Sequence, residues 1–454
     1  MSEHGERASP EGGDRDDAPH GIVEDGLLEP NVPHAGAPPP HVLTNRPFLW
    51  LVLGSGVASI AFWAYFGTLF ADAAFRFEAT ATDAALLLAS FSLPFVLVTP
   101  LAGMWVDRWS PKWVLFGGFV LLASAIPVAL LADSIAWLAV SILVVGVAAA
   151  AIDPARSALT GLLVEERLLV QGNGMLSTAF HGALLIGTLG GGFLIEARGA
   201  DAVYTVATVI AFLGLPGLLL VPDARQRGDR PHMTFRDLGQ GLAIAWHHPE
   251  LRLLLSMALS GYVLMNMLFS LEPLLIRDVI GGGPQAVQFI WAASGLGAVA
   301  GALVVSRIHH GVGLELVLVG GGLAVSGVGL AVYAGLGTYG VALVASTVIG
   351  AGFSFFFTSA LALVQRAAGE ESRGRVTAVL GVLQEGTGLL SSVALASVGA
   401  LVAVQPVLVG SGILLVVVGT LGWRRLVGLQ RAGLAAVPRQ GAAAAVGLRG
   451  RRRG

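Results

Sequence analysis

Two ionisable side chains lie within long apolar stretches of the chain. Glu385 follows Arg375 by ten residues in the stretch 375–402, and His181 lies in the stretch 169–196. Ten helical residues span about 15 Å, which would place Glu385 near the middle of a hydrocarbon layer. Burial there disfavours the charged form of either group, so both are candidates for reversible proton binding. The alternative for each is a hydrogen bond within helix packing.

Apolar stretches of this kind recur from Pro47 onward. Of all residues 55% are hydrophobic and 12% charged, and the mean hydropathy is +0.76. Each stretch reaches the roughly 20 residues that a helix needs to cross a bilayer, and none alternates like a barrel strand. We therefore predict an all-α polytopic membrane protein with twelve spans. The spans are 47–71, 84–106, 111–132, 134–158, 169–196, 201–221, 251–276, 285–306, 314–335, 338–365, 375–402 and 405–427.

The longest connection between these spans separates six of them from the other six. A constant shift of the sequence places His181-Gly182 over Glu385-Gly386, which indicates an internal repeat and two pseudo-symmetric bundles. Within the connection, Phe235 to Trp246 predicts an amphipathic helix along the membrane surface. The predicted domains are a disordered tail (1–46), an N-terminal six-helix bundle (47–221), a linker (222–250), a C-terminal six-helix bundle (251–427) and a basic tail (428–454).

The distribution of basic residues predicts the orientation. With the N-terminus inside, the outer connections carry only Arg76, Arg198 and Arg277, whereas the inner connections carry many more. This positive-inside bias predicts a multi-pass protein of the plasma membrane with both termini in the cytoplasm. The basic tail is then a topology anchor or, as an alternative, a lipid-binding segment.

A charged segment joins the second and third predicted spans. It reads Gly103-Met-Trp-Val-Asp107-Arg108-Trp-Ser-Pro-Lys112. Gly103 permits close approach of helices, and a carboxylate at this helix end can pair with cations and with the amino end of a neighbouring helix. The alternative is a charged turn that only sets topology.

This segment resembles the inter-span signature of the major facilitator superfamily, and the twelve spans in two halves fit the same resemblance. It implies a cytoplasmic gate that locks the halves in the outward-facing state. In the second half, Val305 replaces the aspartate. Further segments, with Asp153 and Arg156 at the end of span four and Arg373 and Arg375 at the start of span eleven, resemble the branch of enterobactin exporters and macrolide efflux proteins. The resemblance implies a charge relay to this gate. A local helix-end pair is the alternative.

Span five is similar to the antiporter signature of drug exporters, Gly-x-x-x-Gly-Pro-x-x-Gly-Gly. The aligned residues are Ala183, Gly187, Thr188, Gly191 and Gly192, with Thr188 in place of the proline. Small residues at this spacing allow close packing of helices, with or without antiport.

The resemblance also implies that spans one, five, ten and eleven line a central cavity. Glu385 would then be the main proton or cation site, with His181 as a second proton or substrate contact. The candidates for the substrate cavity are Phe62, Tyr65, Asn266, Glu272, Phe353, Phe356 and Phe357. For the aromatic residues the alternative is packing, and for Glu272, Asp72 and Asn266 it is solvation or an outer gate at a helix end.

Other classes of site find little support. The net charge is −2, which gives no sign of nucleic-acid binding, and the chain has no cysteine for thiol chemistry or thiolate metal sites. His247-His248 and His309-His310 are adjacent pairs, without the i, i+4 spacing of two metal ligands on one helix face. No phosphate-binding loop is present. We therefore expect no metal, no cofactor and no enzymatic activity.

These patterns predict a monomeric secondary transporter. The expected function is proton-coupled efflux of a hydrophobic or amphipathic small molecule (a drug, siderophore or metabolite) by alternating access. One alternative is an importer or facilitator of a nutrient or lysolipid with the same fold. A more remote alternative is a polytopic membrane enzyme or sensor.

Overall fold

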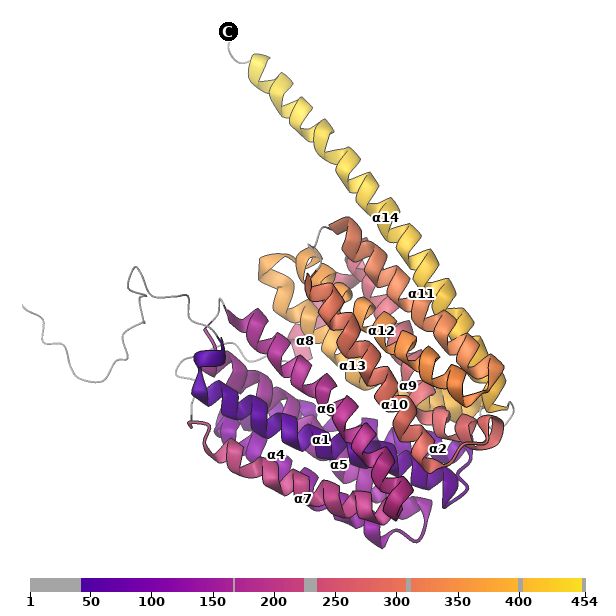
Figure 1. Cartoon of the computed structure of the whole chain (residues 1–454). Coiled ribbons are helices and arrows are strands. Elements are labelled where there is room, and N and C mark those ends of the chain that lie inside the picture. Colours follow the sequence, from indigo (N-terminus) through magenta and orange to yellow (C-terminus); the bar gives the residue numbers. More distant parts are fainter. Residues whose placement is uncertain (1–41, 166–167, 224–234, 308–311, 399–402, 451–454) are drawn as a thin grey trace, which may run out of the picture. The chain divides into compact units, whose positions relative to one another are not determined.

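The computed structural model describes residues 42–165, 168–223, 235–307, 312–398 and 403–450, and their regular structure is helical (Figure 1). Most of the predicted tail 1–46 and part of the linker lie outside these ranges. The helices are α1 (Arg46–Phe75), α2 (Ala81–Leu97), α3 (Thr99–Arg108), α4 (Pro111–Ala125), α5 (Ile135–Leu163), α6 (Leu169–Arg198), α7 (Ala200–Leu219), α8 (Phe235–His247), α9 (Pro249–Leu275), α10 (Pro284–Arg307), α11 (Val312–Leu336), α12 (Tyr339–Ala367), α13 (Gly369–Val398) and α14 (Val404–Gly450).

Local sequence signals set several helix ends. The Asn45 side chain accepts a hydrogen bond from the Phe48 amide (3.1 Å) and caps α1. Thr80 and Asp83 form a reciprocal capping box at the start of α2. Short elements in the described part include the 3₁₀ turns η1 (Val42–Thr44) and η2 (Ile126–Leu131), and the π-helical turn η4 (Ile276–Ile280) after α9.

Eleven helices in the described part of the chain are long and apolar enough to cross a membrane, which confirms the predicted fold class. The predicted span 84–106 differs, because it is divided at Val98 into α2 and α3. Pro100 lies in the first turn of α3 and has no amide hydrogen, so the helical ladder cannot continue unbroken through it. The last predicted span, 405–427, lies in α14, which continues through the residues predicted as a tail.

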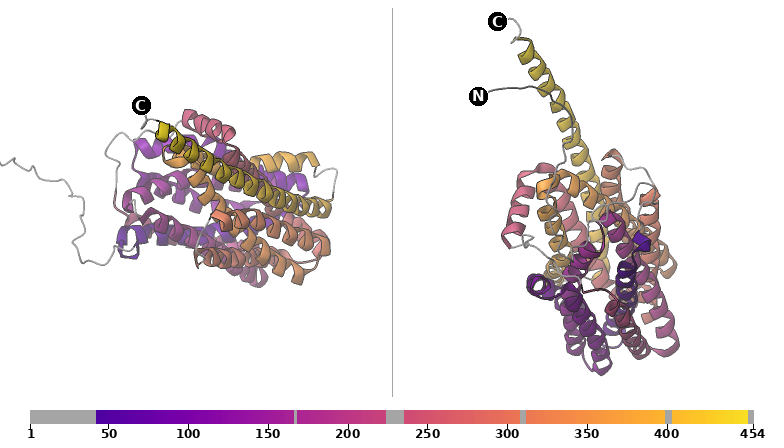
Figure 2. Two further views of the ribbon diagram at one scale, coloured as in Figure 1. Left: turned by 90° about the horizontal axis from the view of Figure 1, so that it is seen from above. Right: turned by 90° about the vertical axis from the view of Figure 1, so that its left-hand side faces the viewer.

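Following the chain order, we refer to α1 to α7 as the first helix group and to α9 to α14 as the second, and Figure 2 shows both in two views. Glycines allow very close helix approach within the second group. A Cβ atom added to Gly297 of α10 would lie 1.9 Å from the Thr347 carbonyl oxygen, and one on Gly350 of α12 would lie 1.9 Å from that of Ser294. Whether these groups act as the two predicted functional halves stays a prediction.

The predicted amphipathic stretch is helical, as α8. Ala245 is buried, whereas the Leu242 and Trp246 side chains are exposed. Its predicted place along the membrane surface is consistent with this exposure, because apolar side chains left free on such a helix can enter the interface.

Candidate functional site

Gln288 of α10 joins the two helix groups. Its side chain is fully buried, and its Nε2 atom donates to the Ala64 carbonyl oxygen (2.9 Å) and to the Thr68 hydroxyl (2.8 Å) of α1. Two glycines of the first group make room for it. A Cβ atom on Gly67 or on Gly191 would lie within 3 Å of the Gln288 side chain. The amide is thus held between α1 and α6.

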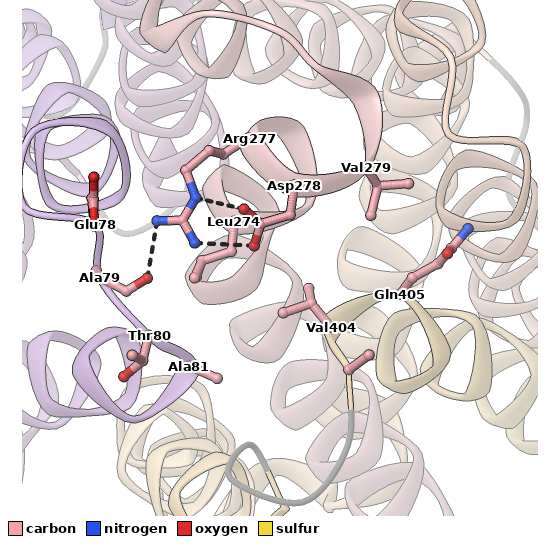
Figure 3. A pocket seen from close by; sticks show the side chains of 11 residues that line it. Glu78, Ala79, Thr80, Ala81, Leu274, Arg277, Asp278, Val279, Val404 and Gln405 are labelled. Atoms are coloured by element: carbon pink, nitrogen blue, oxygen red, sulfur yellow. Dashed lines mark hydrogen bonds and ion pairs between the residues drawn. The ribbon is translucent and has the colours of Figure 1, made fainter.

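Arg277, in η4, makes a second contact between the groups. Its Nη1 atom donates to the carbonyl oxygens of Ala74 (2.7 Å) and Ala79 (3.1 Å) in and after α1. Asp278 orients the guanidinium through bonds of 2.6 and 3.0 Å to Nε and Nη2. Figure 3 shows this arrangement at the edge of a pocket of about 320 Å³. We call this end of the helices the Arg277 end.

Further contacts extend the same seam between the groups. The Ser270 hydroxyl of α9 donates to the Ala84 carbonyl oxygen of α2 (3.0 Å) and is buried. The Trp291 ring of α10 lies 5.9 Å from Phe66 and 6.4 Å from Phe70 of α1. The Arg277 end is therefore closed by hydrogen bonds and by aromatic packing.

The residues aligned with the antiporter signature lie at this seam. A Cβ atom on Gly187 would lie 2.5 Å from the Ile60 carbonyl oxygen of α1, and one on Gly192 would lie 2.7 Å from the Phe289 ring of α10. Ala183 is buried, and the Thr188 hydroxyl donates to the Leu184 carbonyl oxygen (2.6 Å). The small residues of the motif thus allow α6 to pack closely against α1 and α10. Antiport itself stays a prediction.

Two buried carboxyl groups flank the seam. Glu272 of α9 is 3% exposed, and the Trp291 indole donates to its Oε2 atom at 2.8 Å. Asp72 of α1 is 5% exposed and receives a hydrogen bond from the Tyr204 hydroxyl (3.3 Å). Arg76 lies 3.5 Å from the same carboxylate. Both acids thus lie buried at the Arg277 end, each with a hydrogen bond to a neighbouring helix.

Of the proton-binding candidates, Glu385 belongs to α13, and its side chain lies outside the described part of the structure. The Asn266 amide of α9 donates to the hydroxyl of Thr387, two residues further along α13 (3.1 Å). His181 is half-buried on α6, and its Nδ1 atom lies 2.8 Å from the Ser177 carbonyl oxygen of the same helix. Of the two candidates whose side chains are described, Asn266 bridges two helices and His181 bonds within its own helix.

The predicted gate residues lie at the opposite end, which we call the Asp153 end. Asp153 pairs with Arg156 one turn away in α5 (2.5 Å), and the Lys112 ammonium donates to the Leu219 carbonyl oxygen (2.8 Å). Arg108 is exposed, and the space around Gly103 is open. The side chains of Asp107, Arg373 and Arg375 lie outside the described part, so the relay to Asp107 stays a prediction.

The aromatic candidates divide by burial. Tyr65 is completely buried, and its hydroxyl pairs with Ser141 of the same group (2.8 Å). Phe356 is completely buried against Gly261 and Tyr262. Neither side chain is exposed in this structure, and the place of both residues in a substrate cavity stays a prediction. The half-buried candidates are Phe62, Phe353 and Phe357.

Sequence reasoning did not single out Gln288 or Trp291, and it treated Arg277 only as a marker of topology. The sequence did contain a signal for Gln288, because a polar amide inside the apolar stretch 285–306 needs hydrogen-bond partners there. In the described residues, no group of three or more His, Asp or Glu side chains is arranged to hold a metal ion.

A family model described as Major Facilitator Superfamily matches residues 51–392. Over 395 residues the chain is 25% identical to the uncharacterized MFS-type transporter YfiS of Bacillus subtilis (strain 168), covering 83% of this chain and 92% of that protein. Over 233 residues it is 26% identical to the lysophospholipid transporter LplT of Photorhabdus laumondii subsp. laumondii, covering 48% of this chain and 57% of that protein.

Solved structures share the fold at low identity. A bacterial homologue of the human lysosomal transporter Spinster, inward-facing and unoccupied, matches with a TM-score of 0.64 and 14% identity over 84% of this chain and 96% of that one. A POT family transporter in complex with 5-aminolevulinic acid matches with a TM-score of 0.66 and 11% identity over 83% and 95%. Identities this low show the fold alone.

Proposed function

This chain belongs to the Major Facilitator Superfamily, and we propose that it exports a hydrophobic or amphipathic small molecule in exchange for protons by alternating access. The observation that carries the proposal is the seam at the Arg277 end. Gln288, Arg277 and Ser270 tie the two helix groups together there. Transport requires that such a closed end open while the other end closes.

The predicted orientation places the Arg277 end outside, so this state would receive its solute from the cytoplasm. Phe62, Phe353 and Phe357 would supply an apolar wall, and Asn266 a polar contact that fixes orientation. Glu385 remains the proposed main proton site and His181 the second. Solute and proton can each shift the two-state equilibrium only by their differential affinity for the two states.

A second candidate function is transport of a lysolipid, in either direction. The similarity to LplT favours it, although the matched region covers only about half of each chain. An apolar wall with few charges would suit an acyl chain as well as a drug. The family membership weighs against the more remote alternative of a membrane enzyme or sensor.

The test is solute-induced dissipation of a pH gradient in energised inverted vesicles, with a panel of amphipathic compounds that includes a lysophospholipid. We expect at least one compound to release protons with the wild type and not with Glu385→Gln. Glu196→Gln, at an exposed acid, is the matched control and should behave like the wild type. Equal responses of wild type and Glu385→Gln would reject the role of Glu385. No response from folded, inserted protein would reject proton-coupled export.

A further inference from the structure

Glu272 is an acidic side chain buried within a spanning helix, and the mechanism above does not use it. It is 3% exposed, and the Trp291 indole donates to it at 2.8 Å. The Tyr333 hydroxyl of α11 lies beside the same carboxyl group. Both neighbours are neutral, so neither supplies a counter-charge, and the indole N–H can donate to the carboxyl group in either protonation state.

In the part of the chain that the structure describes, Glu272 has no cationic partner. Phe269 and Trp291 pack edge to face at 5.2 Å beside it. Among the described residues, none of the remaining ionisable groups at this end forms a hydrogen bond or ion pair with Glu272. These groups are Asp72 on α1, Arg76 and Glu78 after α1, Asp83 on α2, Asp133 before α5, Glu196 and Arg198 on α6, Asp201 and Tyr204 on α7, Arg277 and Asp278 on η4, and Tyr339 on α12.

Trp291 connects this carboxyl group to the seam. One edge of its indole binds Glu272, and its ring packs against Phe66 and Phe70 of the other helix group. Separation of the two groups at the Arg277 end would uncover the face of the Trp291 ring that contacts Phe66 and Phe70, and water could then reach the indole that binds the acid. Ser270, half a turn before Glu272 on α9, is buried in the same seam.

We propose that the Glu272 carboxyl is a proton-binding site whose occupancy controls closure of the Arg277 end. This inference rests on the proposed function and adds a second site to it. Closure over an ionised carboxylate buries a charge without a cation, which carries a large free-energy penalty. Closure over the neutral acid avoids this penalty. Proton binding thus favours the closed seam, and proton loss favours its opening.

The sign of this coupling suits exchange of an outward-moving solute for an inward-moving proton. A proton that arrives at the open Arg277 end would bind Glu272 and favour closure of that end. The protein would then face the opposite side, where the proton leaves and the solute enters. After the proton is lost, the Arg277 end could open again, and the bound solute would leave through it.

The chain contains no cysteine, so single thiols can report on the seam without prior removal of others. In full-length protein in nanodiscs, we would measure the rate at which an impermeant maleimide labels Ser270→Cys between pH 5.5 and 8.5. A second variant, Leu131→Cys, at a 74% exposed position, corrects for the pH dependence of thiol reactivity. We expect the corrected rate for Ser270→Cys to rise several-fold with pH.

Adding Glu272→Gln, which mimics the protonated acid, should keep labelling slow and independent of pH. The matched Glu196→Gln should leave the pH profile unchanged. Trp291→Phe removes one donor to the carboxylate and should raise labelling at pH 8.5 but not at pH 5.5. If Glu272→Gln does not fold, two other variants test the proposal. Glu272→Asp keeps an acid and should keep the pH response, and Trp291→Phe should change labelling as stated above.

A pH profile that survives Glu272→Gln, or a flat profile that Trp291→Phe does not alter, would overturn the proposal. The assay needs no transported solute, so it can succeed where the vesicle assay fails. A Glu272-dependent profile combined with no proton release by any solute would support this site and reject proton-coupled export.

Discussion

Arg277 shows how one side chain can close a helical assembly. Its guanidinium contacts two carbonyl oxygens of the first group with one nitrogen, while Asp278 holds the other two nitrogens in place. The fork of donors is fixed before the contact forms, so little conformational freedom is lost on closure. Because the side chain is 26% exposed, solvent weakens these bonds without removing them.

We expect Arg277→Gln to favour opening of the Arg277 end. A buried hydrogen bond to a charged group contributes about 1.5–3 kcal/mol. Because Arg277 is partly exposed, we expect its loss to shift the equilibrium between the closed and the open end by a factor on the order of ten. Maleimide labelling of Ser270→Cys at constant pH measures the change. Arg198→Gln, an exposed arginine at the same end, is the control. An unchanged rate would show that the contact does not contribute to closure.

At the scale of helices, the sequence was sufficient wherever an apolar run ends at a clear signal. The predicted span 314–335 and α11 (Val312–Leu336) differ by two residues or fewer at each end. The break at Val98 escaped the same reasoning, because a hydropathy window averages over Pro100 while the backbone loses a hydrogen bond there. Hydrophobicity determines that a helix spans, and single residues determine whether it is continuous.

The contacts between helices could not be predicted in the same way. That Gln288 would lie between Gly67 and Gly191 depends on which faces of three distant helices meet, and this is not a property of any one helix. The burial of Tyr65 is similar, since its partner Ser141 belongs to another span. The sequence therefore indicated which residues are unusual for a membrane span but not which of them touch.

The glycine contact between α10 and α12 leads to a stability prediction. Gly350→Ala would place a Cβ atom 1.9 Å from the Ser294 carbonyl oxygen, so the two helices must separate. Overpacking of this kind destabilises by about 1–3 kcal/mol. We expect a lower Tm in detergent for Gly350→Ala. Gly340→Ala, on the same helix with open space around it, should leave the Tm unchanged or raise it slightly. Equal Tm values would contradict the close packing.

At the scale of the whole molecule, the closed seam and the predicted gate lie at opposite ends of the helices. Arg277 and Gln288 make their contacts at one end, and Asp153 pairs with Arg156 at the other. Alternating access needs this separation, because one end can then open while the other is sealed. Which end faces the cytoplasm follows only from the distribution of basic residues.

The predicted orientation can be measured with thiols in intact cells. Leu131→Cys lies at the Arg277 end and Trp109→Cys at the Asp153 end, and both positions are exposed. We expect an impermeant maleimide to label Leu131→Cys in intact cells and Trp109→Cys only after permeabilisation. The reverse pattern would invert the topology and turn the proposed export into import.

Most bonds that Arg277 and Gln288 make across the seam share a feature with consequences for how this protein varies among relatives. Three of the four reach main-chain carbonyl oxygens, at Ala74, Ala79 and Ala64, and the fourth reaches the Thr68 hydroxyl. Every residue type carries such an oxygen, so substitutions at the accepting positions need no compensating change in the donors. Coevolution between these positions should consequently be weak. Contact inference from alignments would then miss these three main-chain bonds at the Arg277 end.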